Sequence, residues 1–419
     1  MTPEVKERIE QIRHGNVPEG YKKTKLGIVP AEWTEYTIGE CLERVERPVD
    51  VQANEMYTQI GIRSHGKGLF YKEPVTGASL GNKAVYWVEP DCFVLNIVFA
   101  WEQAVSKTTQ NEVGMIGSHR FPMYRPIDGR VDVDYLITYM LTKWGKDILE
   151  AASPGGAGRN RTLGQDRFLK SKIILPFATE QRRIAEVLTS QNKIIELKEK
   201  LLAEKQQMKK YLMQQLLSGK KRLPGFGSEW KKVKLQKLLK ERRTYSPKGA
   251  EYPHATLSTE GIYAKSERYD RDHLVKKDDK EYKITLKGDI CYNPANLKFG
   301  AICINNFANA IFSPIYVTFE VVGKVCSEFL ANYLTQWDFI NAVRKYEEGT
   351  VFERMAVKPE DFLRFEMMLP PYEEQVAIAK ILSAADKEIE LLRQNLEQER
   401  QKKKALMQLL LTGIVRVNV

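Results

Sequence analysis

Hydrophobic residues recur in a heptad pattern at two places along this 419-residue chain. From residue 184 to 216, and again from 378 to 410, apolar side chains are spaced alternately four and three residues apart. An average spacing of 3.5 residues is typical of the contact face of a coiled coil. The sequence therefore predicts two long helices that bury this face. The contact positions are Ile184, Leu188, Ile195, Leu202, Leu212 and Leu216 in the first helix and Ile378, Leu382, Ile389, Leu392, Leu396, Leu406 and Leu410 in the second.

The two predicted helices are copies of one another. "LPFATEQRRIAEVL" from Leu175 aligns with "LPPYEEQVAIAKIL" from Leu369 at an offset of 369 − 175 = 194. Roughly half of the positions through the helix are identical, which indicates an internal duplication. Each copy opens with Pro and carboxylates, which suit a helix N-terminus, and ends at Gly219 or Gly413, which suits a C-cap. About 40 residues at 1.5 Å each predict a helix of roughly 60 Å.

Polar residues interrupt the contact face of both helices, and a second row of apolar residues lies beside it on the first helix. Gln191 and Lys198 interrupt it in the first helix, and Glu399 and Lys403 interrupt it in the second. The first helix also carries a second apolar row that widens its apolar face beyond what a two-helix contact needs. We expect a further partner to pack there, although a purely structural hairpin explains much of the same pattern. The second apolar row is formed by Val187, Ile194, Leu201 and Met208.

The repeat extends into the globular segment that precedes each helix. Short Val, Ile, Tyr and Phe runs between Gly, Asn and Pro predict strands there, followed by one helix near 133–150 and one near 327–345. The stretches near 45–130 and 243–325 differ in sequence, which indicates two modules that do the same kind of task on different targets. The predicted order is an N-terminal helix and connector (1–29), a first module (30–172), the first long helix (173–222), a second module (223–366) and the second long helix (367–419).

The composition of the chain indicates the kind of partner it binds and the cellular compartment in which it works. The net charge of +11 favours a polyanionic partner, and a hydrophobic content of 43% is enough for packed cores. The five cysteines show no C-x-x-C pairing, so neither a zinc site nor a disulfide framework is indicated. Because no apolar run reaches the length of a membrane span and the N-terminus has no apolar signal core, we expect a cytoplasmic location.

Catalytic motifs are incomplete. "GIRSHGKG" from Gly61 has P-loop spacing, but Gly68 stands where a magnesium-binding Ser or Thr is required. "LPPYEEQ" differs by one letter from the NPPY/DPPY motif of DNA amino-methyltransferases, but Leu369 cannot accept a hydrogen bond from a base amino group. Neither a nuclease carboxylate cluster nor a histidine ligand pattern is present. The sequence therefore predicts no catalytic residue and no metal site in this chain.

Basic and polar turns recur in both modules. "PGGAGRNR" from Pro154 places Arg and Asn on a glycine-rich loop, and these side chains make bidentate contacts with guanine and adenine. Any single turn of this kind is more often a solvated surface, so the hypothesis of DNA binding depends on their recurrence. The candidate DNA-binding residues are Arg63, His65, Lys67, Arg120, Arg125, Arg159, Asn160, Arg161, Arg268, Tyr269, Arg271, Asn293, Asn296 and Lys298.

These features resemble the specificity (S) subunits of type I restriction-modification enzymes. The resemblance covers nearly the whole chain and lies in the pattern L-P-x-x-x-E-Q-x-x-I-A-x-x-L, present from Leu175 and from Leu369, and in the N-terminal "YKKTKLGIVPAEW". It implies an α+β fold of two mixed α/β target-recognition domains separated by two long antiparallel coiled-coil helices, with a pseudo-two-fold internal repeat. Each domain would read one half of a bipartite, asymmetric site in double-stranded DNA, and the helices would set the spacer.

The resemblance also implies partners. Two modification (M) subunits would dock on the second apolar row and would carry S-adenosylmethionine together with the true NPPY/DPPY motif. Restriction (R) subunits would use ATP and Mg, and this chain would hold no cofactor. Two alternatives remain: a solitary DNA adenine methyltransferase, which would itself bind S-adenosylmethionine, and a coiled-coil scaffold without sequence-specific DNA binding.

Overall fold

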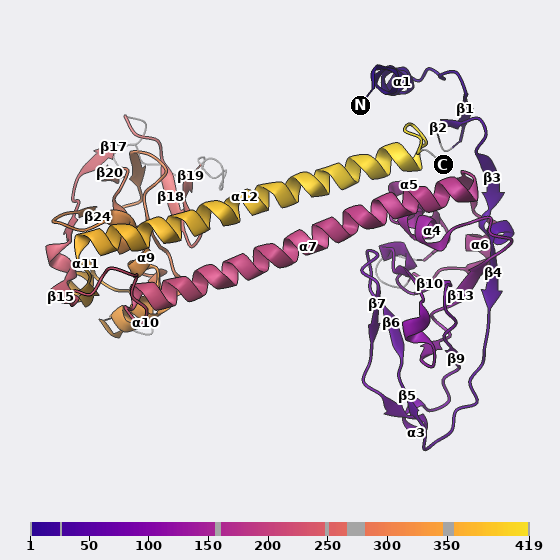
Figure 1. The fold of residues 1–419 in the computed structure, drawn as a ribbon, viewed down its shortest axis with the longest axis horizontal. Helices are drawn as coiled ribbons and strands as arrows, with labels where there is room; N and C mark the ends of the chain where they lie inside the picture. The colour runs from indigo at the N-terminus through magenta and orange to yellow at the C-terminus, as the bar shows by residue number, and fades with distance from the viewer. Residues whose placement is uncertain are drawn as a thin grey trace. The chain divides into compact units, whose positions relative to one another are not determined.

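A computed structural model of the chain describes residues 2–25, 27–155, 161–247, 251–265, 281–346 and 356–417. The chain divides into two units: unit 1 contains Met1–Lys198 and Asn395–Val419, and unit 2 contains Glu199–Gln394. Two helices of 40 residues, α7 (Ala178–Leu217) and α12 (Tyr372–Leu411), each contribute one half to unit 1 and the other half to unit 2 (Figure 1). The two long helices predicted from the heptad pattern are therefore confirmed.

The globular part of unit 1, residues 27–175, is called module 1. Its main sheet has four antiparallel strands in the order β11-β10-β13-β4, and two-stranded pairs flank it. The elements of unit 1 outside the long helices are α1 (Pro3–Arg13), β1 (Tyr21–Thr24), β2 (Gly27–Pro30), β3 (Thr34–Thr37), α2 (Ile38–Cys41), β4 (Leu42–Val45), β5 (Met56–Tyr57), β6 (Ile60–Ile62), β7 (Leu69–Tyr71), β8 (Val75–Thr76), α3 (Gly77–Leu80), β9 (Val85–Trp87), β10 (Phe93–Leu95), η1 (Ala100–Glu102), β11 (Val105–Lys107), η2 (Gln110–Glu112), β12 (Ile116–Ser118), β13 (Met123–Pro126), α4 (Val133–Met140), α5 (Lys143–Ala151), α6 (Gln165–Lys170) and β14 (Lys172–Leu175).

The globular part of unit 2, residues 231–369, is called module 2. Its main sheet also has four antiparallel strands, in the order β16-β24-β21-β22, beside a three-stranded sheet in the order β17-β20-β23. The described elements of unit 2 outside the long helices are β15 (Lys231–Lys234), η3 (Leu235–Lys237), β16 (Leu239–Glu241), β17 (Tyr245–Pro247), β18 (Ala255–Ser258), β19 (Gly261–Ala264), β20 (Glu281–Thr285), β21 (Ile290–Tyr292), η5 (Leu297–Phe299), β22 (Ile302–Ile304), β23 (Ala310–Phe312), β24 (Val317–Val321), α9 (Ser327–Leu334), α10 (Trp337–Val343), η6 (Arg344–Tyr346), α11 (Pro359–Arg364) and β25 (Glu366–Leu369).

The two main sheets have the same strand order when β10, β11, β13 and β4 are matched with β21, β22, β24 and β16. Three of the four strands in each sheet come from the stretches near 45–130 and 243–325, whose sequences differ, and β4 and β16 precede these stretches. The two modules therefore share a main sheet although these stretches differ in sequence. The physical reason is that buried strands accept many combinations of apolar side chains of suitable volume, so the fold persists where identity is lost.

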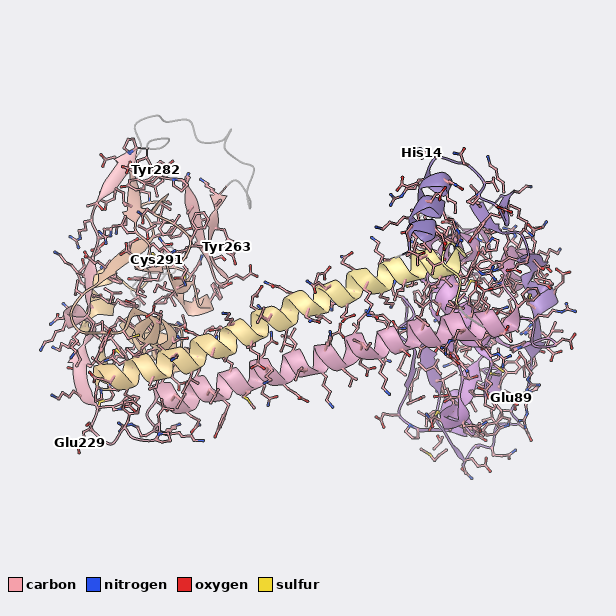
Figure 2. All side chains as sticks on the ribbon, turned by 45° about the horizontal axis from the view of Figure 1, so that its top comes forward. His14, Glu89, Glu229, Tyr263, Tyr282 and Cys291 are labelled. Carbon is pink, nitrogen blue, oxygen red and sulfur yellow. The ribbon has the colours of Figure 1, made fainter. Side chains whose placement is uncertain are left out.

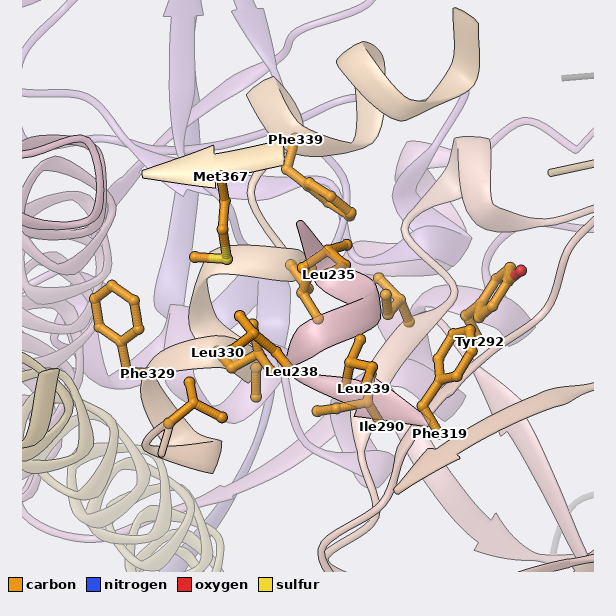
Figure 3. Close-up of a cluster of buried hydrophobic side chains, with 14 of the residues drawn as sticks. Leu235, Leu238, Leu239, Ile290, Tyr292, Phe319, Phe329, Leu330, Phe339 and Met367 are labelled. Carbon is orange, nitrogen blue, oxygen red and sulfur yellow. The ribbon is translucent and has the colours of Figure 1, made fainter. Parts of the chain in front are cut away.

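The core of module 2 is built on stacked aromatic rings beneath the main sheet. Tyr292 stacks on Phe362 with ring centroids 4.8 Å apart, and Phe319 stacks on the same ring at 5.3 Å. Figure 3 shows Tyr292 and Phe319 next to one another in this core. Leu216 of α7 and Leu382 of α12 belong to the same buried cluster. Burial of each large apolar side chain stabilises the fold by about 1.5–3 kcal/mol. The helix ends in unit 2 are therefore anchored in the core of the module.

The helix predicted near 133–150 is in fact two helices, α4 and α5, and the one near 327–345 is likewise divided into α9 and α10. In module 1 the break lies at Thr142, whose hydroxyl accepts a hydrogen bond from Gly145 N–H at 3.2 Å and so caps a new helix. A Cβ atom on Gly145 would lie 2.3 Å from Met140 Cα, so the turn requires glycine there. The sequence pattern missed this break because both helices bury apolar residues.

Within each unit, the halves of α7 and α12 pair in antiparallel orientation. In unit 1, the amide of Gln191 donates to the carboxylate of Glu399 at 2.8 Å, and Lys198, further along α7, contacts Asn395 as well as Glu399. In unit 2, Lys205 pairs with Glu388 at 2.6 Å, and Lys209 pairs with Asp386. Residue numbers rise along one helix as they fall along the other. Every predicted contact position is buried or half-buried.

The helix boundaries follow from their flanking residues. α7 and α12 begin five residues after the predicted boundaries (178 − 173 and 372 − 367), because β14 and β25 precede them. At the other ends, Gly219 and Gly413 have φ angles of 72° and 70°, the left-handed conformation of a helix C-cap. In the part of the chain that the structure describes, no helix combines the length and the apolar character needed to cross a lipid bilayer.

Candidate nucleic-acid interface

Each module contains the same turn between two paired strands of its main sheet. In module 1 the Asn96 N–H donates to Ala104 O at 2.9 Å, and in module 2 the Asn293 N–H donates to Ala301 O at 3.0 Å. Each asparagine then accepts, through its side-chain Oδ1, the backbone N–H two residues later, at 3.0 and 3.2 Å. Both asparagines are buried. They therefore fix the start of the turn in the same way, at an offset of 293 − 96 = 197.

The two turns also close in the same way. A single 3₁₀ turn, η1 in module 1 and η5 in module 2, is followed by a residue in the left-handed conformation, Gln103 with φ 56° or Gly300 with φ 85°. Ala100 and Leu297, at equivalent positions, are fully buried. We call these segments turn 1 (residues 96–103) and turn 2 (residues 293–300). Their backbones are held by matching hydrogen bonds and two buried side chains each.

The exposed side chains of the two turns differ. Turn 1 presents Phe99, which is 36% exposed, and turn 2 presents Phe299, which is 61% exposed. In turn 1 the guanidinium of Arg161 lies over the Trp101 ring at 5.5 Å, and in turn 2 the ammonium of Lys298 lies over the Phe299 ring at 5.2 Å. A cation on an aromatic face can contact phosphate while the ring stacks on a base or wedges a base step.

Three of the predicted DNA-binding residues of module 1 come together at turn 1 from separate segments. The backbone N–H of His65 donates to Glu102 O at 2.8 Å, and Arg120 O accepts the Ile97 N–H at 3.0 Å. The third residue is Arg161, already described over Trp101. A cavity of about 420 Å³ opens beside turn 1 and is lined in part by Asn96, Phe99, Glu102, Lys72 and Phe121. Turn 1 is thus the point where His65, Arg120 and Arg161 converge.

Other predicted residues of module 1 are engaged within the protein. The guanidinium of Arg63 lies over the Phe70 ring at 5.2 Å and donates to Leu69 O at 2.6 Å. Lys67 lies in the same β6–β7 turn. Arg125 forms an ion pair with Glu89 at 3.4 Å, and Glu89, which Figure 2 labels, also pairs with Arg47. The charge of Arg125 is therefore partly neutralised before any ligand is bound.

In module 2 the structure describes three of the predicted residues. Asn293 is buried and holds the turn, whereas Asn296 and Lys298 lie on the turn itself. Five further predicted residues lie outside the described residues. Two of them, Arg159 and Asn160, belong to module 1, and three belong to module 2: Arg268, Tyr269 and Arg271. The sequence reasoning missed Phe99, Trp101 and Phe299 because it followed basic residues. The aligned letters "LNIVFAWEQA" and "YNPANLKFGA" contain a shared Asn and Ala that could have located both turns.

The repeated "LP…EQ" letters form an internal clamp. The Glu374 carboxylate accepts two hydrogen bonds from Arg222, at 2.6 and 2.7 Å, and one from Trp230 Nε1 at 3.1 Å. The equivalent Glu180 accepts two from Arg416, at 2.6 and 2.8 Å, and one from Trp33 Nε1 at 3.3 Å. In both copies the arginine follows the C-terminal glycine of the other long helix, so each helix start is tied to the end of its partner.

The glutamine of the same letters ties the helix start to its module. The Gln181 Oε1 accepts the Asp132 N–H at 2.9 Å, and the Gln375 Oε1 accepts the Cys326 N–H at 2.9 Å. Their amide groups donate to Pro176 O and Pro370 O, at 2.9 and 2.8 Å. "LPPYEEQ" is therefore an architectural motif, and its likeness to a methyltransferase motif does not reflect a base pocket.

The second apolar row of α7 remains largely uncovered. Ile194 and Leu201 are 39% and 40% exposed, and Met208 is 57% exposed, whereas Val187 packs against the core of unit 1. The equivalent positions of α12, at the offset of 194, are Ile381, Glu388, Asn395 and Lys402. The row is thus mainly apolar on one helix and mainly polar on its copy.

Metal-ligand clusters and acidic thiols are two features of catalytic sites that can be assessed in the described residues. Among them, no three His, Cys, Asp or Glu side chains come together as metal ligands. Burial raises the pKa of the Cys41 thiol to about 11 and that of Cys303 to about 12. Because the thiolate is the nucleophile, these protonated thiols are poorly suited to covalent catalysis.

Known proteins with similar sequence and fold agree with the resemblance inferred from the repeat. The family model described as "Type I restriction modification DNA specificity domain" matches residues 227–399. A protein of Methanocaldococcus jannaschii, named as a type I restriction enzyme MjaX specificity subunit, is 25% identical over 95% of this chain and 97% of its own length. The predicted resemblance to type I specificity subunits is therefore confirmed.

Solved structures share the fold over nearly the whole chain. The HsdS subunit from Thermoanaerobacter tengcongensis is 16% identical with a TM-score of 0.52, over 96% of this chain and 98% of that one. The S subunit of a type I restriction-modification system from M. genitalium is 12% identical with a TM-score of 0.54, over 93% and 97%. A chain from a study of complex assembly and conformational transition of the type I R-M system is 16% identical with a TM-score of 0.56, over 92% and 99%. The α+β fold with an internal repeat is thus confirmed.

Proposed function

We propose that this chain is the DNA sequence-recognition subunit of a type I restriction-modification complex, and that each module reads one half of a bipartite, asymmetric DNA site. The observation that carries this proposal is the pair of equivalent turns. Modules 1 and 2 share one backbone frame and present different exposed side chains on it. The same backbone arrangement thus occurs twice with different exposed side chains. Such a pair suits a DNA site whose two halves differ, because contacts with bases determine the sequence preference, whereas contacts with phosphates only position the protein on the duplex.

Methylation and cleavage belong to partner subunits in this proposal. A base inside a duplex must be flipped into a pocket before its amino group can be methylated. Two modification subunits would supply that pocket and S-adenosylmethionine, and restriction subunits would use ATP and Mg. The chain would then act as the recognition and assembly subunit and not as an enzyme by itself.

The long helices would serve both assembly and spacing. The second apolar row of α7, with Ile194, Leu201 and Met208 exposed, is a surface on which a modification subunit could bury apolar area. Each helix is continuous over 40 residues, which corresponds to about 60 Å. That length is close to two turns of B-DNA at about 34 Å each, so a helix pair of this kind can define a fixed gap between half-sites.

The decisive experiment is co-expression of the chain with its modification subunit, followed by mapping of methylated adenines in genomic DNA. We expect methylation at one bipartite sequence with a constant spacer, and no methylation from either protein alone. Binding of S-adenosylmethionine by the isolated chain would favour a solitary methyltransferase. Assembly of a complex that neither methylates nor protects any defined bipartite site would favour a scaffold without sequence recognition.

A further inference from the structure

We infer that turn 1 and turn 2 are the elements that distinguish the bases of the two half-sites, through Phe99 and Trp101 with Arg161 in module 1 and through Lys298 and Phe299 in module 2. This inference rests on the proposed DNA-recognition function and goes beyond it, because it assigns specificity to one short segment of each module.

The backbone of each turn is held rigidly enough to position a reading side chain. Four backbone hydrogen bonds recur at an offset of 197: Asn96 to Ala104 and Asn293 to Ala301, Phe99 to Asn96 and Asn296 to Asn293, Ala104 to Phe99 and Ala301 to Asn296, and Gln103 to Ala100 and Gly300 to Leu297. A backbone that is already ordered loses little further entropy when the turn binds a ligand. Each tip is therefore preorganised with respect to the sheet that carries it.

Exposed aromatic surface lies at the tips, most of all on Phe299 of turn 2. Phe299 leaves 61% of its surface in water, although apolar surface is stabilised by burial. Leu297, two residues before Phe299, is fully buried and anchors the turn. Only the asparagine is identical between the two turns. Ala100 and Leu297 nevertheless keep the same buried place and the hydrogen-bonded positions keep their roles, whereas the exposed Phe99 and Asn296 differ in chemical character. This division suits a constant frame with variable contacts.

The cations at the tips are available for nucleic acid. Arg161 lies over Trp101, and within the described residues it forms no ion pair, so its guanidinium donors can reach guanine or phosphate. The Trp101 ring is itself fixed, because its Nε1 donates to Val98 O at 3.1 Å. In contrast, Arg125 pairs with Glu89, and Arg63 is tied to Leu69 O. The contacts inside module 1 thus favour turn 1 over these other basic residues.

Single substitutions in turn 2 test the inference in the complete complex with the modification subunit. The variants are Phe299→Ala and Lys298→Gln, and the control is Phe307→Ala. Phe307 is 39% exposed and lies at the opposite end of the same β21–β22 hairpin, where Asn305 N–H donates to Asp289 O at 2.7 Å. Complex assembly and the thermal unfolding midpoint verify that each variant is folded.

We expect Phe299→Ala and Lys298→Gln to change the base preference in one half-site, with methylation of the original sequence falling about tenfold or more. The other half-site should keep its preference, and Phe307→Ala should methylate as the unsubstituted protein does. A triple variant, Asn296→Phe, Lys298→Trp and Phe299→Glu, gives turn 2 the side chains that turn 1 has at the equivalent positions, while Leu297 is kept. It should change the base preference in the same half-site.

Two results would overturn the assignment. One is an unchanged preference in all turn 2 variants, and the other is an equal loss on every sequence, which would indicate a phosphate contact and not base reading. Both results leave the proposed function intact if the unsubstituted complex methylates one bipartite site. Absence of such methylation with unsubstituted protein would instead contradict the proposed function.

Discussion

Glu180 and Glu374 occupy equivalent positions at the starts of the two long helices, and both carboxylates are buried. Each is neutralised by an arginine and also accepts an indole N–H, so each carboxylate accepts three hydrogen bonds. A buried charge is costly unless it is paired and hydrogen-bonded. These two glutamates are therefore the residues on which the repeated motif depends.

The buried pairing of Glu374 with Arg222 predicts that loss of Arg222 destabilises the protein more than loss of an exposed arginine. Arg222→Met leaves the buried Glu374 carboxylate without its cation, so we expect the free energy of unfolding of unit 2 to fall, and to fall by more than it does when a surface ion pair is lost. Denaturant unfolding of the full chain measures this change. Arg364→Met is the matched control, because Arg364 pairs with Asp361 on the surface and is 69% exposed, and such pairs contribute about 0–1 kcal/mol. Equal losses in the two variants would contradict the clamp.

At the scale of the long helices, the polar interruptions of the heptad pattern have defined partners. Lys198 and Gln191 both donate to Glu399, and these hydrogen bonds lower the pKa of that carboxyl. A carboxyl whose pKa is lower in the folded state stabilises the fold above its unfolded pKa, and that stabilisation is lost as the pH falls through the folded pKa. The pairing of the helices in unit 1 should therefore weaken in acid.

Substitution of Glu399 tests this linkage. We expect Glu399→Gln to reduce the slope of stability against pH below about 4.5, because the group that takes up a proton on unfolding is gone. The measurement is the thermal midpoint between about pH 3 and 7. Glu397→Gln serves as a control, since the contacts of Glu397, with Arg400 at 4.0 Å and with Gln401 at 2.7 Å, lie within its own helix. A parallel pH dependence in the two variants would contradict the assignment.

Lys209 and Lys403 are equivalent by the repeat (403 − 209 = 194) but differ in their surroundings. Lys209 pairs with Asp386, whereas the position equivalent to Asp386 in the first helix is Asn192. Burial lowers the pKa of Lys403, so its charge opposes folding until the pH rises through the folded pKa toward 10.5. The two lysines thus provide an internal comparison of a paired and a desolvated cation.

We expect Lys403→Leu to raise the free energy of unfolding by on the order of 1 kcal/mol, because it removes a desolvated charge and adds apolar contact. Lys209→Leu should gain less, since it also removes an ion pair. Thermal midpoints of the two variants at neutral pH provide the test. A larger gain for Lys209→Leu would show that burial of Lys403 does not govern the difference.

The sequence predicted the long helices because a heptad pattern sustained over 40 residues has few other interpretations. It did not reveal the shared main sheet, because strands such as Phe93–Leu95 are buried at all three residues and show no alternation. The candidate interface was predicted in part. Basic residues were recognised by type, but the pairing of Arg125 with Glu89, 36 residues away, has no sequence pattern.

At the scale of the whole molecule, the repeat closes each unit with residues from distant parts of the chain. In unit 1, Arg8 of α1 donates to Ile414 O at 2.9 Å, and the Tyr21 hydroxyl donates to Gly413 O at 2.7 Å. Arg416 completes the same unit through Glu180. Unit 1 is therefore built from both ends of the chain, and unit 2 is built from its middle.

Paired heptads along α7 and α12 allow the spacer hypothesis to be tested without disturbing the helix contact. Removal of residues 203–209 together with 385–391 takes out Lys205 with its partner Glu388 and Lys209 with its partner Asp386. One whole heptad is lost from each helix, so the remaining contact positions stay in register. Removal of 203–209 alone shifts the register and serves as the contrasting variant.

Each heptad contributes about 10.5 Å of helix, which corresponds to roughly three base pairs at about 3.4 Å each. We therefore expect the double deletion to methylate the same two half-sites with a spacer about three base pairs shorter, provided that gel filtration shows an assembled complex. The single deletion should lose methylation, because its helices can no longer bury both contact faces. Methylation by the double deletion at the original spacer would contradict the role of the helices in setting the gap, while recognition of the half-sites by the modules would still stand.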